Sequence, residues 1–268
     1  MALLGTLTSG VSALQSFSAG LNTIGNDIAN VDTTAYKSQS TSFADTFNGV
    51  GVQVSSTATD FSQGALSTTG NPTDLGISGN GYFIVEDPAT GDQYATRDGQ
   101  FTINSSGYLV TAQGYEVMGL TGGSASGAPG TLGPIKLGTP PSGTQLQSVT
   151  IGTSGNFVES YSDGSQATTN QVLLQSFTDP SQLTAQGGNL YSNLSAAGPA
   201  STSLAAATNT PGAEGLGSIE AGTLEQSNVD LTTQFANMIT MQRGFEANAR
   251  LVTVSDQILQ DIVNLKQP

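Results

Sequence analysis

The sequence predicts an α+β protein in which long N- and C-terminal helices pair as a coiled-coil-like axial domain around a central, mostly antiparallel β domain. Apolar residues recur at helical spacing near both ends of the 268-residue chain, and the middle alternates short strand-like segments with Gly-rich turns. The domains expected are an axial domain over 1–37 plus 227–268, extended connections over 38–70 and 211–226, and an outer β domain over 71–210.

The first helical segment carries a heptad-like apolar stripe. Four glycines lie within it, among them Gly10 and Gly20. Each interior Gly costs about 1 kcal/mol relative to Ala, so we expect this helix to form only when it packs densely against other helices. The positions expected to pack are Leu7, Val11, Leu14, Leu21, Ile24 and Ile28.

The stretch that ends this helix reads Asn-x-Ile-Ala-Asn-x-x-Thr-x-x-Tyr-Lys. It resembles the N-terminal signature of the bacterial flagellar rod and hook family. Asp27 stands where that family usually has a second Asn, and Ala35 where it usually has Gly. We expect Asn30 to cap the helix in the left-handed conformation. The residues that carry the motif are Asn26, Ile28, Ala29, Asn30, Thr33, Tyr36 and Lys37.

From Leu75 the apolar period changes to two, which predicts β-strands separated by tight turns. The segment Arg97-Asp98-Gly99-Gln100-Phe101 also resembles the family, in its outer β domain. Residues 121–145 are rich in Gly, Ser, Pro and Thr and predict a long surface connection. The strands expected lie within 75–85, 94–97, 100–103, 108–111, 115–119, 149–151, 157–159 and 171–177.

The longest helical signal is the C-terminal segment. Ser227 followed by Asp230 predicts a helix start, and the chain then continues to Leu265 without Pro. The apolar face is wider than one partner helix needs, so we expect neighbouring molecules to cover part of it. The positions expected to pack are Leu231, Phe235, Met238, Phe245, Val252 and Leu259.

The amino-acid composition argues against several classes of function. The chain has no Cys, His or Trp, and six Lys plus Arg against 20 Asp plus Glu give a net charge of −14. The common nucleophiles, bases and soft-metal ligands are thus missing, so we expect no enzyme, no cofactor and no metal site. We also expect no nucleic-acid partner and no direct membrane insertion, because the charge is negative and no run of about 18 apolar residues occurs.

The resemblance covers nearly the whole chain. It implies a structural subunit that self-assembles into the axial tube of the bacterial flagellum, transmits torque and encloses the export channel. The implied partners are further copies of the chain, adjacent flagellar axial proteins, and an export chaperone or cap. The implied location is the hook-basal body, reached without a cleaved signal peptide. The chain ends favour hook protein, whereas the length, with one outer β domain, favours the distal rod protein.

The alternative function, from a different class of protein, is a secreted β-rich glycan-binding module or glycosidase. Glu86, Asp87, Asp92 and Asp98 are the candidate carboxylates, since a carboxylate pair can cleave glycosides. All four lie at hairpin turns or strand ends, where acids ordinarily form solvated turns. A free-standing module also has no use for matched helices at both ends.

Two basic residues of the last helix, Arg243 and Arg250, lie seven residues apart on one face, with Glu246 between them. They form either a solvated ladder along the helix or ion pairs across a subunit boundary. Because charge is scarce in this chain, we expect at least one to pair across the boundary, with Asp27 or Asp32 as the first candidates.

Overall fold

A computed structural model describes residues 2–46, 51–122, 130–138, 143–199, 209–213 and 215–265, without the side chains of 2–4 and 263. The described chain forms two compact units. Unit 1 takes in residues 1–32, 36–62 and 228–268, and unit 2 takes in 33–35 and 63–227. Helices in unit 1 and an antiparallel β structure in unit 2 agree with the predicted α+β class.

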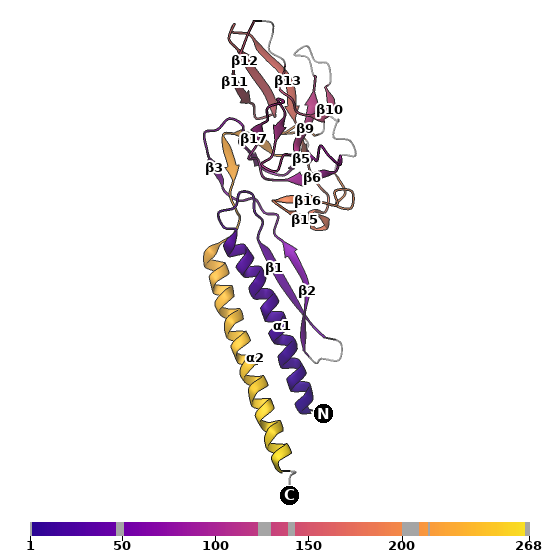
Figure 1. Cartoon of the computed structure of the whole chain (residues 1–268), viewed down its shortest axis with the longest axis vertical. Helices are drawn as coiled ribbons and strands as arrows, with labels where there is room; N and C mark the ends of the chain where they lie inside the picture. The colour runs from indigo at the N-terminus through magenta and orange to yellow at the C-terminus, as the bar shows by residue number, and fades with distance from the viewer. Residues whose placement is uncertain are drawn as a thin grey trace. The chain divides into compact units, whose positions relative to one another are not determined.

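Unit 1 consists of two long helices and a β-hairpin (Figure 1). Helix α1 spans Ala2–Ala29 and α2 spans Leu231–Leu265. Strands β1 (Gln39–Asp45) and β2 (Val52–Thr59) pair antiparallel and lie along α1. The hairpin falls in the stretch expected to be an extended connection.

Asp230 caps the N-terminus of α2. Its Oδ1 accepts a hydrogen bond from the Thr232 backbone N–H at 2.9 Å, and its Oδ2 accepts from the Thr233 hydroxyl at 2.7 Å. The helix therefore starts after Asp230 rather than at Ser227, because the carboxylate caps the first turn itself.

Small residues line the buried face of α1. A Cβ added to Gly10 would lie 2.9 Å from Val252 Cγ2, and one added to Gly20 would lie 3.2 Å from Phe43 Cζ. The helix glycines thus let α2 and the hairpin approach the α1 backbone closely, and this packing offsets their low helix propensity. The buried residues along this face are Gly10, Ala13, Ser16, Gly20, Ile24 and Asp27.

Unit 2 is built on an antiparallel sheet with the strand order β11-β12-β13-β9-β5-β6-β16-β15; β7, β8, β10 and β14 pair onto it, and β17–β4 and β18–β3 form separate pairs. A short 3₁₀ turn, η1, covers Pro180–Gln182. The strands are β3 (Leu66–Thr68), β4 (Leu75–Ser78), β5 (Tyr82–Glu86), β6 (Gln93–Thr96), β7 (Thr102–Ile103), β8 (Leu109–Val110), β9 (Glu116–Thr121), β10 (Thr131–Pro134), β11 (Leu146–Ile151), β12 (Asn156–Tyr161), β13 (Gln166–Val172), β14 (Leu174–Gln175), β15 (Thr184–Gly187), β16 (Leu190–Ser192), β17 (Ser218–Ala221) and β18 (Thr223–Glu225).

Each predicted strand region contains a strand, but the predicted regions leave out β3, β10, β15, β16, β17 and β18. Of these, β10 falls in a stretch with a specific prediction. It lies within 121–145, which was expected to be a surface connection and part of which is outside the described residues. The core of unit 2 gathers apolar side chains from both ends of the sheet order, including Phe83 and Phe101, whose rings meet edge to face at 5.1 Å.

The Arg97–Phe101 segment that resembles the family is buried at three of its positions. Arg97 Nη1 lies 3.3 Å from Glu225 Oε2, and its guanidinium stacks over the Tyr82 ring at 5.1 Å. Glu225 Oε1 also accepts from the Gly64 N–H at 2.9 Å. A Cβ on Gly99 would overlap the Leu75 carbonyl oxygen. The segment, which follows β6 of the sheet, therefore contacts β18 through Glu225 and β4 through Leu75.

Ala35 adopts a left-handed backbone conformation with φ of 56°, and its N–H donates to the Glu225 carbonyl oxygen at 2.8 Å. This is the position where the family usually has Gly. We expect Ala35→Gly to raise the free energy of unfolding by about 0.5–1 kcal/mol, because the relieved left-handed strain exceeds the added chain entropy. Ala185→Gly in β15, where φ is negative, should lower it by a similar amount. Urea unfolding monitored by Tyr fluorescence measures both; destabilisation by Ala35→Gly would contradict the strain.

Candidate assembly surface of the helix pair

Asp27 is the centre of a buried hydrogen-bond cluster in unit 1. Its side chain is fully buried at the end of α1. Oδ1 accepts from the Tyr36 hydroxyl at 3.0 Å, both oxygens accept from the Gln39 N–H at 3.1 Å, and Oδ2 accepts from Gln234 Nε2 at 3.0 Å. One carboxylate thus joins α1, the start of β1 and the first turn of α2.

The other polar motif residues make contacts of their own. Lys37 is buried and its Nζ donates to the Ser62 carbonyl oxygen at 2.7 Å. Asn30 does not adopt the left-handed conformation expected of it. Instead its N–H and its Nδ2 both donate to the Asn26 carbonyl oxygen, at 3.1 and 2.9 Å, which satisfies the end of the helix without a positive φ. Thr33 belongs to unit 2.

Burial raises the pKa of the Asp27 carboxyl above its ordinary value of 3.8, although the Gln39 N–H and the Tyr36 hydroxyl act in the opposite direction. The folded state therefore holds this proton more tightly than the unfolded state, and stability is lost as pH rises from 3.8 through the raised pKa. Asp27→Asn removes the buried charge, and rotation of the Gln234 amide lets its oxygen accept from the new amide.

We expect the melting temperature of Asp27→Asn, relative to the parent, to increase between pH 4 and pH 7. Asp163→Asn is the control without this slope, because the Ser165 hydroxyl and N–H lower the pKa of Asp163, so its contribution to stability changes only below its ordinary value of 3.8. Thermal melts of both variants at each pH measure the slopes. If the melting temperature of Asp27→Asn minus that of the parent falls as pH rises, the buried carboxylate is stabilised when it is charged.

Helix α2 leaves much of its apolar surface uncovered. Among the most exposed side chains are Phe235 at 49%, Ile239 at 51% and Val254 at 52%. Monomeric proteins rarely leave so long a series of large apolar residues in water, which marks a contact surface. The exposed apolar residues of α2 are Leu231, Phe235, Ile239, Phe245, Leu251, Val254, Ile258, Ile262 and Leu265.

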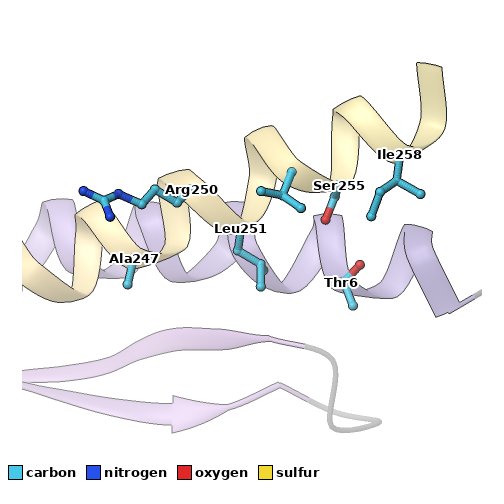
Figure 2. Close-up of a pocket in the computed structure, with 7 residues that line it drawn as sticks. Thr6, Ala247, Arg250, Leu251, Ser255 and Ile258 are labelled. Carbon is cyan, nitrogen blue, oxygen red and sulfur yellow. The ribbon is translucent and has the colours of Figure 1, made fainter. Parts of the chain in front are cut away.

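Part of this surface forms an open, mostly apolar groove of about 500 Å³ between the second half of α2 and the beginning of α1. Figure 2 shows the labelled α2 side chains arranged along the helix, with Thr6 contributed by α1. We call this the groove; its lining residues are Thr6, Ala247, Arg250, Leu251, Val254, Ser255 and Ile258.

The positions predicted to pack fall into two groups. On α1, Ile24 is buried and Val11 is exposed at 42%, while the remaining stripe residues Leu7, Leu14, Leu21 and Ile28 are half-buried. Apart from Ile24, the stripe therefore lies beside the small-residue face rather than on it. On α2, Met238, Val252 and Leu259 are half-buried, whereas Leu231, Phe235 and Phe245 are exposed. The small residues at steps of three and four were the available signal for the buried face of α1.

The charged candidates are separated in the single chain. Arg243 and Arg250 are both exposed, and within the described residues neither side chain makes an ion pair or hydrogen bond, so the ladder with Glu246 is not formed. Asp27 is already bonded inside unit 1, and Asp32 is exposed. The arginines are therefore open to a partner outside the chain.

Of the acids considered for catalysis, Asp87 and Asp98 form turns, and Glu86 bonds across the β5–β6 pair. Asp87 Oδ1 accepts from the Ala89 N–H at 2.8 Å, Asp98 Oδ1 accepts from the Gln100 N–H at 3.1 Å, and Glu86 pairs with the Gln93 amide at 3.0 Å. In the described part of the chain, no three acidic side chains are grouped as metal ligands are. The described helices also include none that is long and apolar enough to cross a membrane.

These features are typical of an assembling structural subunit: a helix pair with uncovered apolar faces and a β domain whose candidate acids are not grouped into a site. Three family models match the sequence. They are the flagella basal body rod protein over 7–37, the flagellar hook protein FlgE/F/G D1 domain over 76–158, and the flagellar basal body rod FlgEFG protein C-terminal region over 220–265.

Relatives cover the whole chain. The flagellar basal-body rod protein FlgG of Bacillus subtilis is 35% identical over 99% of this chain and 100% of its own, and that of Borreliella burgdorferi is 31% identical over 100% and 99%. The flagellar hook protein FlgE of Rhizobium meliloti is 41% identical, but over 44% of this chain and 31% of its own. The chain belongs to the flagellar rod and hook protein family, a family of structural components of the flagellum and its basal body.

Proposed function

We propose that this chain is the distal rod subunit of the flagellar basal body. The observation that carries the proposal is the end-to-end alignment with relatives named FlgG, against a partial alignment with the hook protein relative. The chain ends favoured hook protein, but the family models that match those ends are described as models of basal body rod proteins. The length with one β domain fits the rod alternative better.

In this role the exposed apolar face of α2 is covered by further copies of the chain. Burial of apolar surface, at about 25 cal/mol per Å², supplies the free energy of association, and a tube built in this way transmits torque and encloses the export channel. Adjacent axial proteins take the place of copies at the two ends of the rod. We also propose that the chain is exported without a cleaved signal peptide and that an export chaperone or a cap is one of its partners.

The test is the position of a tagged copy in the flagellum. The gene is deleted in a flagellated bacterium and replaced by a copy with an epitope tag in the loop at Gly91, whose surroundings are open. Hook-basal bodies are purified and labelled with antibody for electron microscopy. Label on the rod below the hook is the expected result, with an untagged strain as control. Label along the hook would support hook protein instead, and unlabelled particles would exclude both.

A further inference from the structure

Two different apolar surfaces lie on α2. The first half carries Leu231, Phe235 and Ile239 at steps of four, which we call the ridge. The second half carries the groove, centred on Val254 and Ile258. On a helix of 3.6 residues per turn, ridge and groove are centred roughly 135° apart. One straight neighbour cannot cover both surfaces, so α2 faces two neighbours.

The ridge and the groove match each other at one offset. An offset of 19 residues along α2 takes Phe235 to Val254 and Ile239 to Ile258, and it takes Leu231 to the level of Arg250, next to Leu251. A row of side chains at steps of four is the kind of ridge that packs into the groove of a second helix. In parallel helices this offset is an axial shift of about 28 Å.

The same offset brings opposite charges together. Arg243 of the ridge copy comes within one residue of the level of Asp261 in the groove copy. The two positions are 18 residues apart, or about five full turns, so they share one side of α2, in the sector between ridge and groove. When the two copies are parallel, the sector between ridge and groove lies on the same side of the contact in both of them. Arg243 and Asp261 are exposed, and within the described residues neither has a partner.

We infer that the ridge of one copy packs into the groove of a second, parallel copy, offset by 19 residues, with Arg243 of the first paired to Asp261 of the second. The inference deepens the proposed rod function and rests on it. Because the contact joins two different surfaces, each copy keeps a free ridge or a free groove, and the contact propagates into an open series instead of closing a dimer.

Helix α1 of a second copy is the other candidate for the groove. Over Ala2–Ala29 it has no basic residue, and its one acid, Asp27, is buried. An α1 helix in the groove would thus leave Arg243 and Asp261 unpaired. Charge complementarity favours the ridge of α2.

Engineered disulfides test the register in full-length chains. The natural chain has no Cys, so introduced thiols are the only ones. Phe235 and Val254 lie on one helix about 28 Å apart, so a chain carrying Phe235→Cys and Val254→Cys can form this disulfide only between copies. The matched control pairs Phe235→Cys with Thr253→Cys, one residue away and on the side of α2 away from the groove.

After oxidation of assembled polymers, we expect a ladder of covalent oligomers from Phe235→Cys/Val254→Cys on a non-reducing gel, and mostly single chains from the control. Polymers without this ladder would overturn the inference. A ladder from Val11→Cys/Val254→Cys in its place would put α1 in the groove. Both results leave the proposed rod function standing. A parent chain that never polymerises would overturn the inference and the proposed function together.

Charge exchange provides a second test that needs no thiols. Arg243→Asp and Asp261→Arg should each raise the concentration needed for polymerisation about tenfold, because each places like charges across the contact. The double variant should return to within about twofold of the parent. Arg250→Asp combined with Asp261→Arg is the mismatched control and should not recover. A double variant as weak as the singles, with the parent's melting temperature, would overturn the pair.

Discussion

Arg97→Met is expected to lower the free energy of unfolding of unit 2 by about 3–5 kcal/mol, because the substitution leaves the Glu225 carboxylate buried without its cation. The side chain of Glu225 has no exposed surface, and that of Arg97 is 5% exposed. The substitution also removes the stacking of the Arg97 guanidinium over the Tyr82 ring. Glu225→Gln should cost a comparable amount, since the guanidinium is then the unpaired charge.

The double variant Arg97→Met/Glu225→Gln should recover part of the loss, because no uncompensated charge remains. Urea unfolding by Tyr fluorescence measures the cycle, since the chain has seven Tyr and no Trp. Lys136→Met is the matched control: its ammonium lies 4.9 Å from the Tyr108 ring centre but is exposed, so we expect a loss of about 0.5–1 kcal/mol. Single losses at Arg97 and Glu225 no larger than the control's would contradict the buried pair.

Gly99→Ala is expected to destabilise unit 2 by about 3 kcal/mol, at the upper end of the range for overpacking. The added methyl group would overlap the Leu75 carbonyl, which belongs to backbone and cannot rotate away. Relief requires movement of β4, whose Leu75 N–H donates to the Gly99 carbonyl at 3.0 Å and which pairs with β17. The movement therefore breaks contacts on both sides of β4.

Gly133→Ala in β10 provides the control for Gly99→Ala. An added Cβ there meets only Thr121 Oγ1, at the ordinary distance of 3.6 Å. We expect a change within about 0.5 kcal/mol, measured by the same urea unfolding. If Gly99→Ala is tolerated as well as Gly133→Ala, the close approach of Leu75 does not limit this turn.

Periodicity in the sequence was enough to predict the two helices and, in unit 2, the strands β4–β9 and β11–β14, because their apolar spacing and Gly-rich turns are local signals. The strand β10 escaped because Gly133 and Pro134 are turn residues by propensity. Pro134 is tolerated there since β10 is an edge strand, paired in the described chain with β9.

The buried face of α1 could not be read from hydrophobicity alone. The large residues of the stripe, such as Leu14, rank above Gly10 and Gly20 on any apolar scale, yet the glycines are the buried positions. Their burial follows from how closely α2 and the hairpin approach, which is a property of the fold. The same holds for Asp27. The scarcity of charge in the chain made it a candidate for an ion pair, and only the fold shows three donors around it.

Polymerisation of Val254→Asp tests most directly the central claim that the uncovered apolar face of α2 is an assembly surface. Val254 is 52% exposed in the single chain, so the substitution leaves the monomer folded, whereas a charge in a packed contact costs several kcal/mol. Thr253→Asp, on the side of α2 away from the groove, is the control. In sedimentation, we expect polymers from the parent and from Thr253→Asp, and monomers with the parent's melting temperature from Val254→Asp. Polymers of Val254→Asp at the parent's concentration would contradict the claim.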